Sequence, residues 1–291
     1  YLGMFVRNDG SPSLVGIATA CGGIFNIFGD FFLTFTCGLG MEGAAIATVA
    51  GQGIVFAIQL IHFFTRKNTI SFVRVTALLK QGKQIISIGF SSFICSVGMG
   101  VLIVLFNNQI MRYLGSRELA VYGVASSLFI LVQTFSYGIG NAAQPIVSEN
   151  LGARQWDRIR ETKNWGCIVA AAMGITATVA SLLFPTEIVS LFMKASEEVT
   201  AIAPSILRQY FICLLFVPFN VFAAYYLQAV KQVGQSVAVS VLRGFLLSGL
   251  LVYIFPIWLG PDSIWFVMVG AECVTAIAAV YLLNQKIQKG A

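Results

Sequence analysis

The chain has 291 residues, of which 57% are hydrophobic and only 10% are charged. Soluble domains are about 45–50% apolar and about 25% charged, so this composition excludes an ordinary soluble globular protein. Eighteen Lys and Arg residues against twelve Asp and Glu residues give a net charge of +6. The positions of these charges, described below, exclude nucleic acid as the partner that the positive charge would otherwise suggest.

Apolar segments follow one another along the whole chain, each near the roughly 20 residues that a helix needs to cross a bilayer. Residues 1–6 have the character of a helix end, so we expect the chain to start inside a longer protein. The predicted spans then cover residues 14–37, 43–65, 84–106, 119–147, 165–185, 205–229, 236–257 and 263–284. The strict alternation of a barrel strand, over about 10 residues, is missing from them. We therefore predict an all-α polytopic membrane protein with about eight transmembrane helices.

Two connecting segments are longer than a simple turn requires. Residues 66–83 carry five cations among apolar residues, a pattern that fits a cytoplasmic interfacial helix. Residues 186–204 mix apolar residues with Glu187, Glu197 and Glu198 on the opposite side. For both segments we predict a linker that lies on the membrane surface.

The cations in the loops predict the orientation of the chain. Thirteen Lys and Arg residues fall on the side of Arg7 and the C-terminus, against Arg112, Arg117 and Lys194 on the other side. Positive residues accumulate in cytoplasmic loops. We therefore expect a multi-pass protein of a prokaryotic inner (plasma) membrane with a cytoplasmic C-terminus, and no nucleic-acid partner.

The residue types required by the common enzyme motifs are missing. The single histidine, His62, excludes an HExxH metal site and is expected at the membrane interface, and the chain has no Walker A loop. The six cysteines lie in apolar segments without metal-type spacing, so we expect buried free thiols and no metal site. These absences favour a transporter over an enzyme.

Three polar residues in the first two spans form the main candidate site. Charge inside the hydrocarbon is costly, so Asp30 is a functional hypothesis by default. Asn26 lies four residues before it, on the same helix face. A rise of 1.5 Å per residue places Asp30 roughly 10 Å deep and Thr48 roughly 8 Å deep in adjacent antiparallel helices. The three side chains offer oxygen ligands for Na⁺ or a proton relay, which predicts a cation-coupling site. A structural hydrogen-bond triad is the alternative.

Other intramembrane residues suggest supporting roles. Arg243 and Glu272 lie in the last two spans at depths that a long arginine side chain can bridge, so an intramembrane ion pair with a structural role is predicted. Gln144, Pro145 and Pro218 mark a possible helix hinge, since proline frees a backbone carbonyl, and a static kink is the equal alternative. The many aromatic residues suit a cavity for flat, lipophilic and often cationic ligands.

Four stretches of the chain share a pattern with one transporter family. They are Arg7–Gly10 with Asn26–Asp30 and Gly43–Thr48, Gln144–Val147 with Asn150–Ala153, Leu227–Ala229 with Gly234 and Leu242–Arg243, and Ile264–Trp265 with Ala271–Glu272. On these residues the chain resembles the multidrug and toxic compound extrusion (MATE) family. The resemblance implies a twelve-helix protein of two lobes around a V-shaped cavity, of which the chain holds the tail of helix four and helices five to twelve.

The resemblance also implies a domain division. Residues 1–65 would be the end of the N-terminal lobe, residues 66–83 a cytoplasmic linker between the lobes, and residues 84–291 the C-terminal lobe. Asn26, Asp30 and Thr48 match members of the N-lobe cation site in one prokaryotic branch, whereas that site's first-helix aspartate is absent.

Two departures from the family pattern affect the expected coupling ion site. Gly89-Phe90-Ser91 stands where many members have Gly-x-Pro, and the spans 84–106 and 205–229 contain no carboxylate. The Na⁺-coupled branch carries Glu and Asp in those two helices. The resemblance therefore leaves the N-lobe site as the expected coupling centre.

The function implied is a cation-coupled (H⁺ or Na⁺) antiporter that exports lipophilic, often cationic drugs or toxins by alternating access. The coupling ion would be its only cofactor, and its partners would be drug-like small molecules and membrane lipids around a monomer. The alternatives are a lipid-linked oligosaccharide flippase of the same superfamily, for which only Arg243 could meet the pyrophosphate, and a channel or scaffold that transports nothing.

Overall fold

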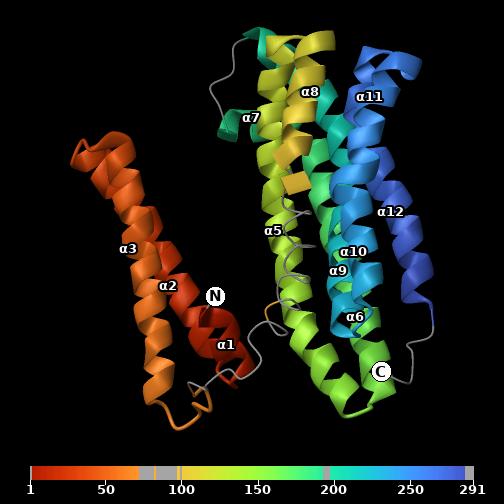
Figure 1. Ribbon diagram of the computed structural model, residues 1–291. Coiled ribbons are helices and arrows are strands. Elements are labelled where there is room, and N and C mark those ends of the chain that lie inside the picture. The colour runs from red at the N-terminus through yellow and green to blue at the C-terminus, as the bar shows by residue number, and fades with distance from the viewer. Residues whose placement is uncertain (1, 72–81, 83–96, 99, 193–196, 286–291) are drawn as a thin grey trace. The chain divides into compact units, whose positions relative to one another are not determined.

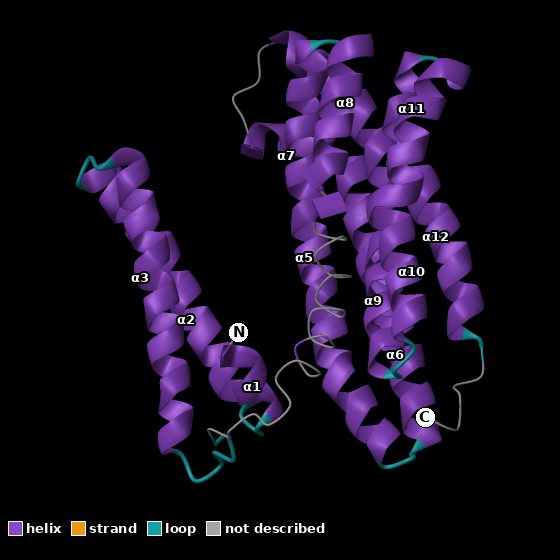
Figure 2. Ribbon diagram, in the orientation of Figure 1, coloured by secondary structure: helices purple, strands orange, loops and turns teal. Residues whose placement is uncertain are grey.

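The computed structural model describes residues 2–71, 82, 97, 98, 100–192 and 197–285. All regular structure within these residues is helical, and Figure 2 shows helices and loops without a strand. Seven of the helices in this part of the chain are long and apolar enough to cross a membrane. They are Pro12–Thr36, Gly40–Phe64, Ser116–Gly152, Trp156–Leu183, Glu197–Ala229, Val233–Leu259 and Pro261–Leu283.

These spans confirm the prediction of an all-α polytopic membrane protein. Each one overlaps a segment predicted from hydropathy; most ends differ by five residues or fewer, but the spans that begin at Trp156 and Glu197 start nine and eight residues earlier than predicted. The remaining predicted span, 84–106, lies mostly outside the described residues, and its end continues into a helix over 100–113. The predicted linker over 66–83 also lies largely outside them.

The chain divides into two compact units, Tyr1–Leu79 and Lys80–Ala291. The first unit contains α1 (Leu2–Asn8), α2 (Pro12–Phe31) and α3 (Gly40–Leu60). Helix α2 continues through a π-helical turn, Phe32–Thr36. The chain then reverses at Gly38 and Gly40, whose φ values of 69° and 54° favour glycine, and α3 returns antiparallel to α2.

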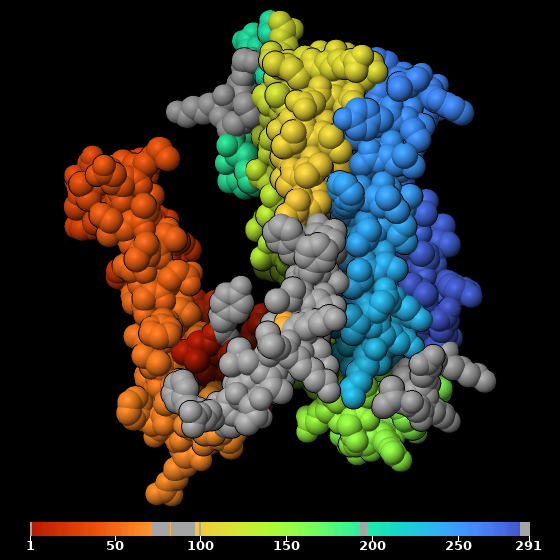
Figure 3. All heavy atoms as spheres, in the orientation of Figure 1, coloured from red at the N-terminus to blue at the C-terminus, as the bar shows by residue number. Residues whose placement is uncertain are grey.

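Glycines bring α2 and α3 close together. A Cβ atom on Gly22 would lie 2.7 Å from the carbonyl oxygen of Gly51, and a Cβ on Gly51 would lie 2.9 Å from that of Gly22. Farther along, a Cβ on Gly29 would lie 3.0 Å from the Cβ of Ala47. Within a membrane, small residues stabilise helix pairs because they let the backbones approach. In the space-filling view the atoms of α3 lie directly against those of α2 (Figure 3).

The second unit is a helical bundle (Figure 1). After the helix over 100–113 it contains α5 (Ser116–Gly152), α6 (Trp156–Leu183), α7 (Pro185–Phe192), α8 (Glu197–Tyr210), α9 (Val217–Ala229), α10 (Val233–Val241), α11 (Leu247–Leu259) and α12 (Val267–Leu283). Helix α9 is the central one, since ten of its thirteen residues are buried and it contacts α5, α6, α10 and α12.

Two spans of this bundle change their helix type in the middle. A 3₁₀ segment, Phe211–Leu215, joins α8 to α9. Pro218 follows it and has no N–H to offer the carbonyl of Leu214, which explains why regular α-helical bonding is interrupted here. A π-helical turn, Leu242–Leu246, joins α10 to α11 and places Arg243 within it.

The described residues of the segment 186–204, for which a linker on the membrane surface is predicted, are helical and pack into the bundle. The segment contributes most of α7 and the first half of α8. Val189, Val199 and Ala203 are buried and belong to the larger apolar core of the bundle. Their helical spacing turns these apolar side chains to one face, where they pack instead of meeting lipid or water.

The prediction of buried thiols holds for only part of the cysteines. Cys213 is buried, Cys167 and Cys273 are half-buried, and Cys21 and Cys37 are exposed on the helix surface. Cys95 lies outside the described residues. An apolar segment alone does not bury its cysteines, because the outer face of a membrane helix is apolar as well.

Candidate functional site

The predicted polar triad of the first unit is only partly assembled. Asn26 Nδ2 of α2 donates to Thr48 Oγ1 of α3 across 3.3 Å. Thr48 Oγ1 in turn donates to the carbonyl oxygen of Ala44, 3.0 Å away in its own helix. The close approach at the glycines explains the first contact, since a Cβ on Gly51 would lie 3.2 Å from the Cβ of Asn26.

Asp30 does not join this hydrogen bond. Its Oδ1 is buried and makes no hydrogen bond with any described residue. A buried carboxylate oxygen without a partner is costly, because the charged form loses its hydration without compensation. A proton or a metal cation on the carboxylate would relieve that cost.

A second polar cluster lies at the other end of the same helices, where sequence reasoning saw only an interfacial histidine. His62 is fully buried, and its Nε2 donates to Asp9 Oδ2 across 2.7 Å. The backbone N–H of Thr69 donates to the same oxygen across 2.8 Å, and the Thr69 hydroxyl donates to Asp9 Oδ1. Asp9 thereby connects the start of α2 to the end of α3.

These hydrogen bonds stabilise the charged form of Asp9. The hydroxyl of Thr69, the imidazole of His62 and the backbone N–H of Thr69 together lower the pKa of Asp9 from its ordinary 3.8 to about 2. The sequence contains one signal for this cluster. The single histidine, His62, and the acid Asp9 both lie near the same predicted membrane boundary.

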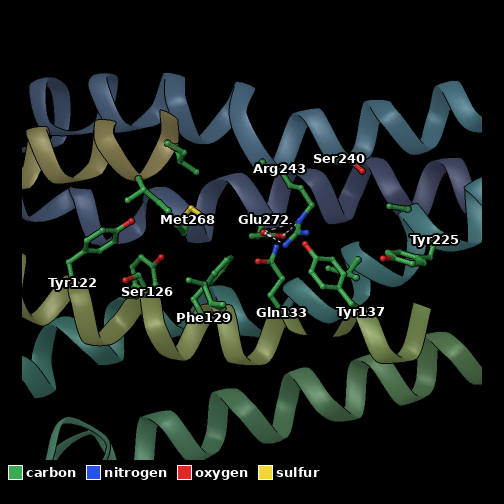
Figure 4. A pocket seen from close by; sticks show the side chains of 17 residues that line it. Tyr122, Ser126, Phe129, Gln133, Tyr137, Tyr225, Ser240, Arg243, Met268 and Glu272 are labelled. Atoms are coloured by element: carbon green, nitrogen blue, oxygen red, sulfur yellow. Dashed lines mark hydrogen bonds and ion pairs between the residues drawn. The ribbon is translucent and has the colours of Figure 1, made fainter. Parts of the chain in front are cut away.

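The second unit contains a cavity of about 220 Å³ between its helices (Figure 4). Four tyrosines line it, together with apolar and polar side chains from the helix over 100–113, α5, α9, α12 and the turn around Arg243. At one end the rings of Tyr122 and Tyr210 meet edge to face, with centroids 6.0 Å apart. Toward the other end Tyr137 and Tyr225 lie with their ring centroids 6.0 Å apart.

An ion pair occupies the wall of this cavity. Arg243 Nη2 donates to Glu272 Oε1 across 2.8 Å, and Arg243 Nε donates to Oε1 and Oε2 across 3.1 and 3.3 Å. Both side chains are almost fully buried, 9% and 1% exposed. The structure therefore brings together the two residues whose helix depths suggested a pair, and Figure 4 shows them between the tyrosines.

Asn220 completes the charged group and was missed by sequence reasoning. Its Nδ2 donates to Glu272 Oε2 across 2.7 Å and to the backbone oxygen of Glu272 across 2.8 Å. Asn220 is fully buried on the central helix α9, two residues after Pro218. A lone amide in an apolar stretch is a weak signal, because its partner lies 52 residues away in the sequence.

In the π-helical turn at Arg243, a side chain forms a hydrogen bond with a backbone carbonyl group. Ser248 Oγ donates to the carbonyl oxygen of Arg243 across 2.8 Å. A π-helical turn leaves some carbonyl groups without their usual partner, and such turns are frequent at functional sites. The turn places the guanidinium where it meets Glu272.

The residues predicted as a hinge lie in α5 and at the start of α9. Gln144 Nε2 donates to Gln228 Oε1 across 3.2 Å, which links α5 to α9. Pro145 lies inside α5, which continues without interruption to Gly152. Pro218 lies at the start of α9, directly after the 3₁₀ segment.

The chain is similar in sequence to a described protein family and to two curated bacterial proteins. A family model described as MatE matches residues 88–254. The multidrug export protein MepA of Staphylococcus saprophyticus is 25% identical over 98% of this chain and 64% of its own length. The protein of the same name from Staphylococcus aureus reaches 26% identity with the same coverage. The chain thus spans less than two thirds of the length of these relatives.

Solved structures show the same helical arrangement. A structure described as the outward-facing conformation of a multidrug resistance MATE family transporter gives a TM-score of 0.81 at 21% identity, covering 93% of this chain and 61% of that one. A MATE structure in the straight conformation gives a TM-score of 0.87 at 20% identity, covering 98% and 65%. At these identities the comparison establishes the fold.

Proposed function

This chain belongs to the MatE family, and we propose that it forms part of a cation-coupled exporter of drug-like, lipophilic and often cationic compounds. The exporter works by alternating access as a monomer in a bacterial plasma membrane, in exchange for H⁺ or Na⁺. Support for the export of drugs comes from the staphylococcal relatives, both named multidrug export proteins. In this proposal residues 1–65 and 84–291 belong to two lobes, and the C-terminus is cytoplasmic.

The proposed coupling rests on the missing hydrogen bond of Asp30 within the described part of the chain. Its buried Oδ1 lacks a hydrogen bond among the described residues, while Asn26 and Thr48 already bond to each other nearby. A proton or Na⁺ bound at Asp30 neutralises the carboxylate, and its release restores a charge within a membrane span, which is costly. Because that cost depends on helix packing, ion occupancy biases the equilibrium between the two access states.

The cavity of the second unit supplies a substrate site in this proposal. Aromatic walls with a few polar groups are typical of pockets that bind lipophilic molecules. Gln144, Pro145 and Pro218 are proposed as the hinge that changes access to it, since the 3₁₀ segment before Pro218 already departs from regular helix.

The flippase alternative has less support in the described residues. A lipid-linked pyrophosphate carries several negative charges and needs several cationic partners, whereas Arg243 is the one cation that the described residues contribute to the wall of the cavity. A cavity of about 220 Å³ is also small for an oligosaccharide carrier.

Ion-driven efflux from proteoliposomes tests the proposal, with the full natural protein that contains this chain. We expect Asp30→Asn to abolish efflux driven by an imposed pH or Na⁺ gradient, because it keeps the size of the side chain and removes the titratable group. Asn26→Ala and Thr48→Ala should reduce efflux less, since neither carries the charge. Equal amounts of folded protein, checked by size-exclusion chromatography, are the control. Wild-type efflux by Asp30→Asn under both gradients would place the coupling group elsewhere.

A further inference from the structure

The hydrogen bonds around Glu272 engage both oxygens of its carboxylate. Oε1 accepts from Arg243 Nε and Nη2, and Oε2 accepts from Arg243 Nε and Asn220 Nδ2. Nε carries a single N–H, which the two oxygens share, so three N–H groups in all point at the carboxylate. A cationic ligand in the cavity would have to compete with these donors for the acid.

Arg243, by contrast, keeps N–H donors for which no described residue is the acceptor. Its guanidinium has five N–H donors, and Glu272 takes only the edge formed by Nε and Nη2. Nη1 forms no hydrogen bond within the described part of the chain, and it is not one of the fully buried atoms that lack a partner. Since Arg243 lines the cavity, this donor edge is open to it.

The other described residues that line the cavity carry no charge. Arg243 and Glu272 are the charged residues among the described residues of the wall, and the others are aromatic, apolar or neutral polar. Hydrogen bonds from a guanidinium to a carboxylate are among the strong ones, all the more in a site with little water. Among the described residues the cavity therefore presents an available N–H donor group, whereas both oxygens of its acid, Glu272, are already engaged.

We propose that this cavity binds planar aromatic compounds that carry a carboxylate, with the carboxylate on the Nη1 edge of Arg243 and the ring system among the tyrosines. Glu272 holds the guanidinium from its other edge and so fixes its direction. The volume of about 220 Å³ is below the roughly 300 Å³ of a drug-sized pocket, which favours one or two fused rings. The inference deepens the proposed export function, to which it adds a substrate class that differs from the lipophilic cation.

Binding to the full natural protein in detergent tests this inference without any transport. The probes are naphthoate, its neutral isostere naphthamide and the cation naphthyltrimethylammonium, measured by isothermal titration calorimetry. We expect wild-type protein to bind naphthoate most tightly. The variant Arg243→Gln/Glu272→Gln removes both charges together, so it leaves no single buried charge. It should weaken naphthoate binding at least about tenfold and naphthamide binding less than about threefold.

Two further variants make the result specific. Arg117→Gln/Glu198→Gln removes an exposed ion pair outside the cavity, whose side chains are 61% and 62% exposed, and should leave all three affinities unchanged. Arg243→Lys keeps the charge and loses the fork of donors, so it should bind naphthoate more weakly than wild type. If the double glutamine variant fails to fold, Arg243→Lys still tests the inference.

Several outcomes would overturn the inference. One is naphthoate affinity that does not change in Arg243→Lys and the double glutamine variant, and another is tighter wild-type binding of the cation than of naphthoate. A third is Arg243-dependent binding of phosphatidic acid in lipid nanodiscs without such binding of naphthoate, which would assign the site to a lipid phosphate. Arg243-dependent naphthoate binding without ion-driven efflux would support this inference and count against the proposed export function.

Discussion

At the scale of single residues, the function of this chain depends on which polar atoms remain without a partner. Asp30 and Glu272 are both acids within membrane spans, and the sequence does not distinguish their roles. In the structure both oxygens of Glu272 accept hydrogen bonds from Arg243 or Asn220, whereas Asp30 Oδ1 lacks a hydrogen bond among the described residues. This difference assigns a holding role to Glu272 and makes Asp30 the stronger candidate for exchange with an ion.

Arg243 and Glu272 should depend on each other for stability. Removal of one partner leaves a buried charge uncompensated, which costs roughly 3–5 kcal/mol, whereas removal of both costs less than the sum. A double-mutant cycle with Arg243→Ala and Glu272→Ala, followed by thermal unfolding in detergent, measures the coupling. Strict additivity of the two single changes would rule out a pair that matters for stability.

Asp9 should make stability depend on pH in acid. Its pKa is lowered to about 2 in the fold, so its stabilising effect is complete above its ordinary pKa of 3.8 and is lost as the pH falls toward 2. We therefore expect the difference in Tm between wild type and Asp9→Asn to be constant above about pH 5 and to shrink below about pH 4.

The control for this pH series is Glu161→Gln, which changes an exposed carboxylate without a hydrogen bond or ion pair among the described residues. Its difference from wild type should stay small throughout. A Tm difference for Asp9→Asn that grows as the pH falls would contradict the assigned hydrogen bonds.

At the scale of helices, close packing through glycine explains why Asn26 meets Thr48. Hydropathy predicts that α2 and α3 span the membrane, but it carries no information on how each helix is rotated about its axis. The approach of Gly22 to Gly51 sets that rotation, because any larger side chain there meets backbone atoms. Asn26 lies one helical turn from Gly22 and is therefore carried to the same interface.

Gly22 and its neighbour Gly23 provide a matched test of this packing. A Cβ at Gly22 would lie 2.3 Å from Val55 Cγ2 and 2.7 Å from the carbonyl oxygen of Gly51, whereas a Cβ at Gly23 meets no described atom within 4 Å. Gly22→Ala should destabilise the helix pair by about 1–3 kcal/mol, as overpacking does. Gly23→Ala should be neutral or slightly stabilising, because alanine favours helix. Equal thermal stabilities of the two variants in detergent would exclude glycine-mediated packing.

At the scale of the whole molecule, the charge pattern predicts an orientation that the fold alone does not. Basic residues gather in alternate loops, and such loops stay in the cytoplasm. We expect a green fluorescent protein fused to the C-terminus of the full natural protein to fluoresce, and an alkaline phosphatase fused there to be inactive in a bacterial cell. The opposite pair of results would invert the predicted topology.

Hydropathy and helix rise were sufficient to predict the membrane class, the helical fold and the positions of the spans, because these properties depend on neighbours along the chain. The same reasoning placed Asn26 near Thr48 and Arg243 near Glu272, since residues at similar depth in adjacent helices lie within reach. It did not predict Asn220 at Glu272, Asp9 at His62 or which aromatic residues line the cavity. Those contacts depend on how each helix is rotated and on where it changes to a 3₁₀ or π turn, and packing between segments far apart in the sequence sets both. The proposed substrate class rests on one such detail, the edge of Arg243 that Glu272 leaves open.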